Sequence, residues 1–172
     1  MFEMWIPISD ILDEGKEFTF DDQTPWHAGW KEHSIAAKPG KDLVAVVTVL
    51  PQGEDGALVR GTLKGSVITP CDRCLSDFEL DINVNFDAFE QLPDGEYDEE
   101  PRVRTDSGQL QLNIGAILWE EFALALPVKP LCSEGCKGMC PDCGKDLNTG
   151  KCDCEQDKGD ERLAVFRNLK IK

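Results

Sequence analysis

The cysteines of this 172-residue chain are the residues whose number and spacing indicate a chemical role. Six of the eight cysteines fall in one short segment, in the order Cys132-x3-Cys136-x3-Cys140-x2-Cys143-x8-Cys152-x-Cys154. The other two form the motif Cys71-Asp72-Arg73-Cys74. A Cys-x-x-Cys motif on a tight turn presents two thiolates to one metal from the same side, and zinc binds four ligands in a tetrahedron. The dense segment therefore predicts a metal-binding module.

The predicted ligands are Cys140, Cys143, Cys152 and Cys154. The first two lie on a tight turn, here called a knuckle, and the loop after it returns the chain to the other two. Pro141 presets the turn, and Gly144 tolerates the positive φ that such a turn needs. Cys132 and Cys136 form a competing pair, because one four-coordinate ion cannot use six thiolates. We expect one zinc ion per chain, although spacing alone does not separate zinc from an iron–sulfur cluster.

The Cys71/Cys74 pair supplies only half of a zinc site, so three interpretations stay open. The pair could be a redox couple, could join the cysteine-rich tail, or could shape a turn beside a binding surface. Arg73 between them could contact a phosphate or an acid of this acidic chain. We find no phosphate-binding loop, nucleophile elbow or metalloprotease motif in the sequence, and we predict that the protein is not an enzyme.

Charge limits the partners that the chain can bind. The net charge is −15, with 33 acidic and 18 basic residues, which opposes non-specific binding to nucleic acid. The last eleven residues differ, because they hold four basic residues and no acid: Arg162, Arg167, Lys170 and Lys172. The first ten residues lack the basic end of a secretory signal, and no apolar run approaches the ~20 residues of a membrane span. We therefore expect a cytosolic protein with reduced thiols and no membrane partner.

Hydrophobic patterning predicts the elements that must position these cysteines. Residues 78–88 alternate between apolar and polar side chains, which is typical of a strand with one buried face. Further strands are expected near residues 4–8, 17–20, 43–50, 57–69 and 110–112, and a helix is expected over residues 114–126, before Pro127. Residues 91–108 are acidic and predict a loop, and the pattern of residues 23–31 predicts no particular element.

These elements predict an α+β protein in three parts. Residues 1–128 form an antiparallel β-sheet or open β-barrel with one packed helix. Residues 129–156 form the small cysteine-rich zinc-binding module. Residues 157–172 form a C-terminal amphipathic helix that packs back on the body, with Leu163, Phe166 and Leu169 facing the core.

Several of these motifs together resemble the YceD family, the large ribosomal RNA subunit accumulation proteins. The resemblance rests on Gly65-Ser66-Val67 before Cys71-Asp72-Arg73-Cys74-Leu75, on Ile117-Leu118-Trp119-Glu120-Glu121, and on the tail from Leu131 through Cys154. Asp160-Glu161-Arg162-Leu163 is similar to the closing motif of the family, with Glu161 where a proline is usual. The form with a cysteine-rich tail fits best.

The resemblance implies a non-enzymatic role in the accumulation of large-subunit ribosomal RNA, through RNA processing or ribosome assembly. Its partner would be that RNA or a basic ribosomal protein, with no small-molecule substrate. The residues expected to bind RNA or the partner are Cys71, Arg73, Cys74, Arg162, Arg167 and Lys170. Two alternatives stay open: a zinc-ribbon adaptor that binds another protein without RNA contact, and a thiol oxidoreductase that uses Cys71 and Cys74.

Overall fold

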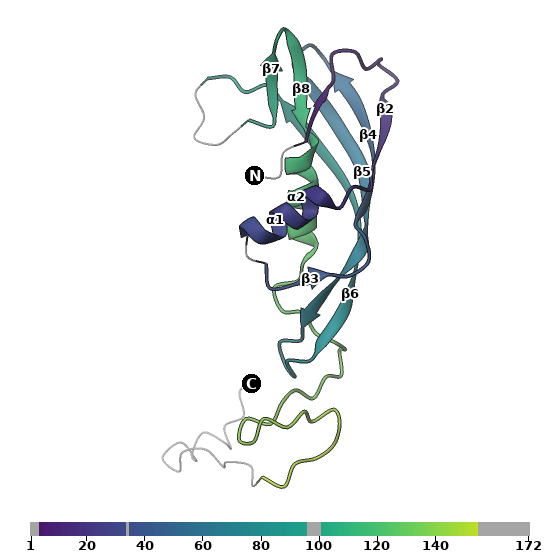
Figure 1. Cartoon of the computed structure of the whole chain (residues 1–172). Helices are drawn as coiled ribbons and strands as arrows, with labels where there is room; N and C mark the ends of the chain where they lie inside the picture. Colours follow the sequence, from purple (N-terminus) through teal and green to yellow (C-terminus); the bar gives the residue numbers. More distant parts are fainter. Residues whose placement is uncertain (1–3, 34, 96–100, 155–172) are drawn as a thin grey trace, which may run out of the picture.

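A long antiparallel hairpin is the spine of the molecule. The computed structural model describes residues 4–33, 35–95 and 101–154. The hairpin consists of β5 (Gly56–Pro70) and β6 (Asp77–Gln91), which pair along their whole length from Gly56↔Gln91 to Pro70↔Asp77. It curves along one side of the molecule, both helices lie on its concave side, and the cysteine-rich tail lies beyond its turn (Figure 1).

The larger sheet is built around this hairpin, and all its strands pair antiparallel. β2 (Lys16–Phe20) pairs with β4 (Val44–Gln52), and β4 pairs with the first part of β5. The short β3 (Lys38–Pro39) pairs with the far part of β5 at Ile68 and Val67. The alternation predicted for residues 78–88 is confirmed, because Ile82 and Phe86 are buried whereas the odd-numbered residues of β6 are exposed.

A smaller three-stranded sheet has the order β1–β8–β7. It consists of β1 (Trp5–Pro7), β7 (Val103–Asp106) and β8 (Gln109–Asn113). β7 corrects the prediction of a loop over residues 91–108. The acidic neighbours hid this strand in the sequence, but Val103 is fully buried and pairs with Leu112, and Arg104 lies over the Trp5 ring at 3.8 Å.

Two helices pack on each other in the body, where the sequence predicted one. α2 (Ile114–Ala125) was expected; Asn113 caps it by accepting a hydrogen bond from the Ala116 N–H, and it ends before Pro127. α1 (Thr24–His33) was not predicted. Gly29 lets α1 approach α2 closely, since a Cβ there would lie 2.5 Å from Trp119. Helix α1 is therefore specified by an aromatic contact across the fold rather than by its own apolar periodicity.

The core lies between the larger sheet and the helices. Many of its fully buried side chains come from β4, β5 and α2, among them Val47, Val59, Leu63, Ile117, Leu118 and Phe122. Of the core residues expected from the pattern, Val84 is partly buried against this core, and Phe78 packs instead on a second cluster formed by Cys71, Cys74 and Cys136. The hydrophobic contacts of the hairpin tip thus continue into the cysteine-rich tail.

Gly65 and Ser66, which precede the Cys71–Cys74 motif, lie in β5 beside the segment that joins β3 to β4. Gly65 has a φ of +158°, and a Cβ there would lie 2.7 Å from the Asp42 carbonyl oxygen. The fully buried Ser66 hydroxyl accepts a hydrogen bond from the Lys41 N–H and donates one to Glu79, each 2.7 Å long. These contacts hold the segment between β3 and β4 against β5, so this part of the motif is structural.

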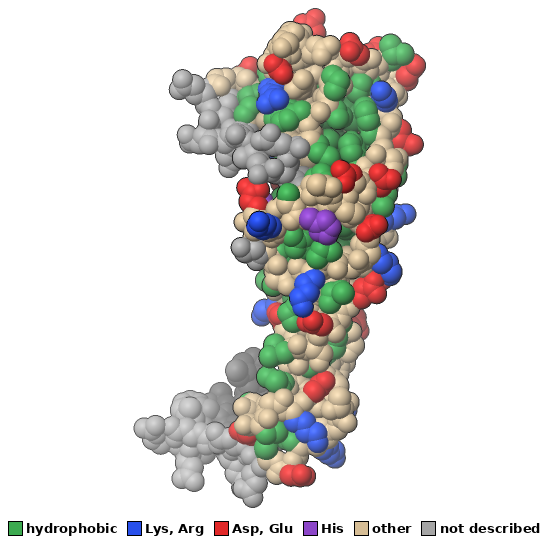
Figure 2. Space-filling model, viewed as in Figure 1, with side chains coloured by type: hydrophobic (Ala, Val, Ile, Leu, Met, Phe, Trp, Pro, Cys, Tyr) green, Lys and Arg blue, Asp and Glu red, His purple; other side chains and the backbone are tan. Residues whose placement is uncertain are grey.

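The α+β class with antiparallel sheets is confirmed. On the face shown in Figure 2, basic and acidic side chains are interspersed with hydrophobic ones. Among the described helices, none is long and apolar enough to span a membrane. The predicted C-terminal helix over residues 157–172, with Arg162, Arg167 and Lys170, lies outside the described residues, and the three-part domain division stays a prediction.

Candidate metal centres

The structure sorts the eight cysteines into two groups of four. The joint group contains Cys71, Cys74, Cys132 and Cys136, and the tail group contains Cys140, Cys143, Cys152 and Cys154. Within each group the four sulfur atoms lie within 4.8 Å of one another, and all eight cysteines are free thiols. The joint group links the tip of the β5–β6 hairpin to the tail, whereas the tail group lies wholly within the tail.

The first two cysteines of each group lie on turns with the same hydrogen bonds. In the joint group the Cys71 N–H donates to the Ser76 carbonyl (3.0 Å), and the Leu75 N–H donates to the Cys71 carbonyl (2.8 Å). In the tail group the Cys140 N–H donates to the Lys145 carbonyl and the Gly144 N–H to the Cys140 carbonyl, both at 2.9 Å. The residue after the second cysteine has positive φ in both turns. The sequence therefore builds the same knuckle twice.

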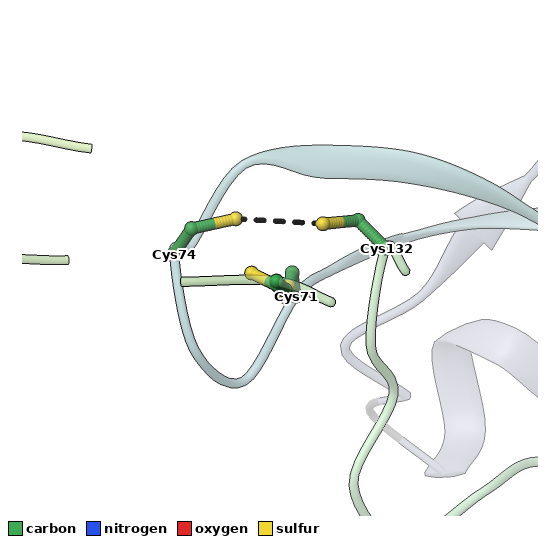
Figure 3. A group of neighbouring side chains, drawn as sticks. Cys71, Cys74 and Cys132 are labelled. Atoms are coloured by element: carbon green, nitrogen blue, oxygen red, sulfur yellow. Dashed lines mark hydrogen bonds between the residues drawn. The ribbon is translucent and has the colours of Figure 1, made fainter. Parts of the chain in front are cut away.

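The sulfur positions fit a single tetrahedral ion. In the joint group, the Sγ atoms of Cys71 and Cys136 are 3.8 Å apart. Those of Cys74 and Cys132 are also 3.8 Å apart, and Figure 3 shows this second pair beside Cys71. A tetrahedral zinc with sulfur ligands at about 2.3 Å separates its sulfurs by about 3.8 Å, whereas a disulfide brings them to about 2.0 Å. Four thiolates are also the donor set of a structural zinc site. Both groups can therefore hold a metal ion.

Arg73 fastens the tail to the hairpin tip. Its Nη1 donates to the Cys136 carbonyl (3.0 Å) and the Glu134 carbonyl (3.4 Å), and its own carbonyl accepts a hydrogen bond from the Met139 N–H (2.9 Å). The adjacent Asp72 N–H donates to the Pro130 carbonyl at 2.9 Å. The side chain of Arg73 thus contacts backbone carbonyls rather than an acid, and its proposed contact with RNA stays a prediction.

Hydrogen bonds divide the thiols of each group into easily and poorly ionised ones. A hydrogen bond from the Cys132 backbone N–H is the main cause that lowers the pKa of Cys71 to about 6, and one from the Cys143 backbone lowers the pKa of Cys140 to about 7. Contact with the Cys136 side chain raises the pKa of Cys132 to about 12. Since a metal ion binds thiolates, a bound ion would displace the protons that the neighbouring sulfurs share.

The placement of the predicted site residues changes one part of the sequence-based interpretation. The four cysteines predicted as ligands do lie together, but Cys132 and Cys136 do not compete with them. Cys132 and Cys136 lie with Cys71 and Cys74. Of the three interpretations left open for Cys71 and Cys74, this arrangement agrees with the one in which they join the cysteine-rich tail. The cysteines that meet here are separated by 58 and 65 positions in the sequence, and no local spacing could have indicated that contact.

Asn148 is a residue whose contact with the cysteines the sequence did not reveal. Its Nδ2 donates to the Cys136 sulfur at 3.4 Å, and its Oδ1 accepts a hydrogen bond from the Lys137 N–H at 2.8 Å. The hydrogen bond from Asn148 is the main cause that lowers the pKa of the Cys136 thiol. Asn148 belongs to the loop between Cys143 and Cys152, so one side chain connects the two groups.

The fold and these groups define an α+β protein with two four-cysteine groups that could bind metal ions. Residues 59–170 match the sequence model of the family described as large ribosomal RNA subunit accumulation protein YceD. This match covers more than half of the chain, and the chain therefore belongs to the YceD family.

Curated relatives are similar to parts of this chain, and one of them carries the name of this family. Uncharacterized proteins of Mycobacterium bovis and Mycobacterium tuberculosis are each 32% identical over 99 residues, covering 54% of this chain. The chain spans about half (46%) of the length of these two relatives. The chloroplastic large ribosomal RNA subunit accumulation protein YCED homolog 1 of Arabidopsis thaliana is 32% identical over 60 residues, which is 35% of this chain and 19% of that protein. No solved structure matches the chain significantly.

Proposed function

We propose that this protein is a non-enzymatic factor that supports the accumulation of large-subunit ribosomal RNA, through RNA processing or ribosome assembly. The match of residues 59–170 to the YceD family carries this proposal. The name of the chloroplastic relative, which also refers to large-subunit ribosomal RNA, supports it. We further propose that the protein binds zinc through at least one of the two cysteine groups, because four neighbouring thiolates suit that ion. A cytosolic location, expected from the sequence, is part of the same proposal.

The distribution of charge indicates which part of the chain can approach RNA. Residues 1–128 contain nine basic and 25 acidic residues, whereas residues 129–172 contain nine basic and eight acidic residues. RNA repels an acidic surface, so the body is unsuited to contact with phosphates. Several basic side chains of the body are moreover paired with acids, as Lys38 is with Asp77 and Lys41 with Glu79. Direct contact with RNA is therefore proposed for residues 129–172.

The acidic body suits a basic protein better than RNA, and this supports a second, assisted route. A basic ribosomal protein held on the body would lie close to the RNA that the tail approaches. Both routes depend on charge and weaken with salt, but only the direct route predicts binding to RNA alone. A protein-binding adaptor without any link to RNA differs from both routes in its effect in cells, because its loss would leave the amount of large-subunit ribosomal RNA unchanged.

Depletion of the protein tests the proposal. We expect less mature large-subunit ribosomal RNA relative to small-subunit RNA, measured by quantifying both RNAs after depletion and after complementation with the wild-type gene. An unchanged ratio would refute the proposed function. Purified full-length protein, prepared without chelator, tests the zinc proposal separately by elemental analysis, and protein without any metal would refute it.

The two routes are separated by salt titration of RNA binding. The variant to test replaces Lys137, Lys145 and Lys151 of the tail with Gln, and the matched control replaces Lys38, Lys41 and Lys64 of the body with Gln. The direct route predicts weaker binding and a shallower salt dependence for the tail variant only. Equal binding by both variants and the wild type would refute direct contact through the described tail.

A further inference from the structure

We propose that the two four-cysteine groups bind two metal ions as a coupled pair, in which an ion in the tail group orders the loop that holds Asn148 against the joint group. The joint ion in turn fixes the tail to the tip of the β5–β6 hairpin. This inference rests on the metal binding proposed above and extends it from the single expected ion to two ions with a shared contact.

The joint group has the features of a metal site in its own right. Its knuckle repeats the hydrogen bonds of the tail knuckle, and its sulfur pairs are 3.8 Å apart as a tetrahedral ion requires. Leu75 takes the position that Gly144 takes in the tail, with a φ of 60° against 72°. A non-glycine residue rarely adopts this conformation, so the surrounding structure imposes it. Metal coordination by Cys71 and Cys74 gives a physical reason for that geometry.

The tail group controls the position of Asn148. The loop over residues 144–151 begins after Cys143 and ends before Cys152, which belong to the same group. An ion bound by both cysteines closes this loop at its two ends and reduces the number of conformations open to it. Within the loop, the Asn148 N–H and Nδ2 both donate to Asp146 Oδ1, at 2.8 and 2.7 Å. Asn148 is therefore rigid when the loop is closed.

Asn148 transmits this order to the joint group. Its Nδ2 donates a hydrogen bond to the sulfur of Cys136. Its Oδ1 accepts a hydrogen bond from the N–H of Lys137, the residue that follows Cys136. The Leu147 N–H also donates to the Gly138 carbonyl at 2.9 Å, which holds the loop against the segment between the two groups. A hydrogen bond to a ligand sulfur stabilises the thiolate form that binds metal. Loss of the tail ion should therefore weaken the joint site.

The joint group also determines where the tail lies relative to the body. Two of its ligands come from the hairpin turn, and two come from the segment that follows α2. Besides the thiols, the contacts across this junction include the hydrogen bonds of Asp72 and Arg73 to the Pro130, Glu134 and Cys136 carbonyls. A joint ion would add four bonds to this junction. Metal loading of the joint site therefore sets the orientation of the tail lysines relative to the acidic body.

The experiment measures metal binding by the full-length protein. Zinc is removed by competition with a chromophoric chelator, and Cd²⁺ bound in place of zinc reports the two groups as separate NMR signals. Cys143→Ser removes an exposed ligand that belongs only to the tail group. Asn148→Asp keeps the acceptor for the Lys137 N–H but loses the Nδ2 hydrogen bonds to Cys136 and to Asp146. Thr149→Val is the matched control, because Thr149 bonds to Asp146 in the same loop.

We expect two ions per wild-type chain and one per Cys143→Ser chain. The affinity of the joint site should fall roughly 10–100-fold in both Cys143→Ser and Asn148→Asp, and stay near the wild-type value in Thr149→Val. The double variant should lose no more than Cys143→Ser alone, because both changes remove the same contact. By reciprocity, Cys74→Ser should weaken the tail site by the same factor.

The outcomes separate the inference from the proposal beneath it. Equal joint-site affinity in the wild type, Cys143→Ser and Asn148→Asp would overturn the coupling while leaving two metal sites. One ion per wild-type chain would overturn the pair while leaving the proposed zinc binding. Absence of metal would overturn both. If Cys143→Ser unfolds the tail, the tail-site affinity of Asn148→Asp still decides the coupling, because this variant removes no ligand and reciprocity requires its tail site to weaken together with its joint site. Thr149→Val should leave both affinities near the wild-type values.

Discussion

The two knuckles predict opposite effects from substitutions at equivalent positions. Leu75 and Gly144 both follow the second cysteine of a knuckle and have φ values of 60° and 72°. The left-handed conformation costs an L-residue roughly 1–2 kcal/mol but costs glycine almost nothing. Leu75→Gly should therefore strengthen the joint knuckle, and Gly144→Ala should weaken the tail knuckle.

The magnitude is taken from the backbone alone, because the Leu75 side chain is mostly exposed and a Cβ at position 144 would meet no close neighbour. A Cβ at Gly144 would have as its nearest neighbour the Met139 sulfur, 4.0 Å away, and the Leu75 side chain is 60% exposed. Glycine gains freedom in the unfolded chain, which offsets about 0.4–1 kcal/mol of the backbone cost. The net effect is about 0.5–1 kcal/mol in each direction, or about a 2–5-fold change in metal affinity.

Zinc competition with a chelator measures both affinities in the full-length chain, and far-UV circular dichroism confirms that the body stays folded. Gly135→Ala is the matched control, because Gly135 lies between Cys132 and Cys136 but has no atom within 4 Å of an added Cβ. Its affinity should equal that of the wild type. A Leu75→Gly variant that binds metal more weakly than the wild type would refute the equivalence of the two knuckles.

Three further predictions concern the packing that positions the site. Gly29→Ala should destabilise the protein by about 1–3 kcal/mol in urea unfolding, because its Cβ would lie 2.5 Å from Trp119, and a Trp119→Leu background should remove this cost. Phe122→Ala should lower the free energy of unfolding by about 3–5 kcal/mol in the same assay. Leu124→Ala, at a side chain that is 73% exposed, should change it by less than about 0.5 kcal/mol. Similar losses at both positions would contradict the assigned core. Arg73→Lys should speed the chelator-driven release of joint-site metal about 2–10-fold, since a lysine cannot reproduce the hydrogen bonds of the guanidinium to two carbonyls; an unchanged rate would show that these bonds do not hold the tail.

The local elements could be predicted because their signals are local. Alternating side chains over residues 78–88 correspond to β6, and the apolar face after Asn113 corresponds to α2. The Cys140–Gly144 knuckle was recognisable because five consecutive residues contain the ligands, the proline and the glycine that it needs. Two of the elements that were missed, α1 and β7, have weak patterns of their own. Gly29 of α1 fits against Trp119, and Val103 of β7 is buried beside Leu112, so tertiary contacts specify both.

The sequence by itself determined that the tail is rich in metal-type ligands and that the chain resembles the YceD family. Only the tertiary structure decided how the cysteines are grouped. Cys71 meets Cys136 across 65 residues, because the β5–β6 hairpin places its turn at the end of the sheet where the segment after α2 returns. Asn148 likewise reaches the Cys136 sulfur only in the folded tail. Spacing reports neighbours within one turn or loop, whereas contacts between distant segments depend on the pairing of whole strands, which no short motif encodes.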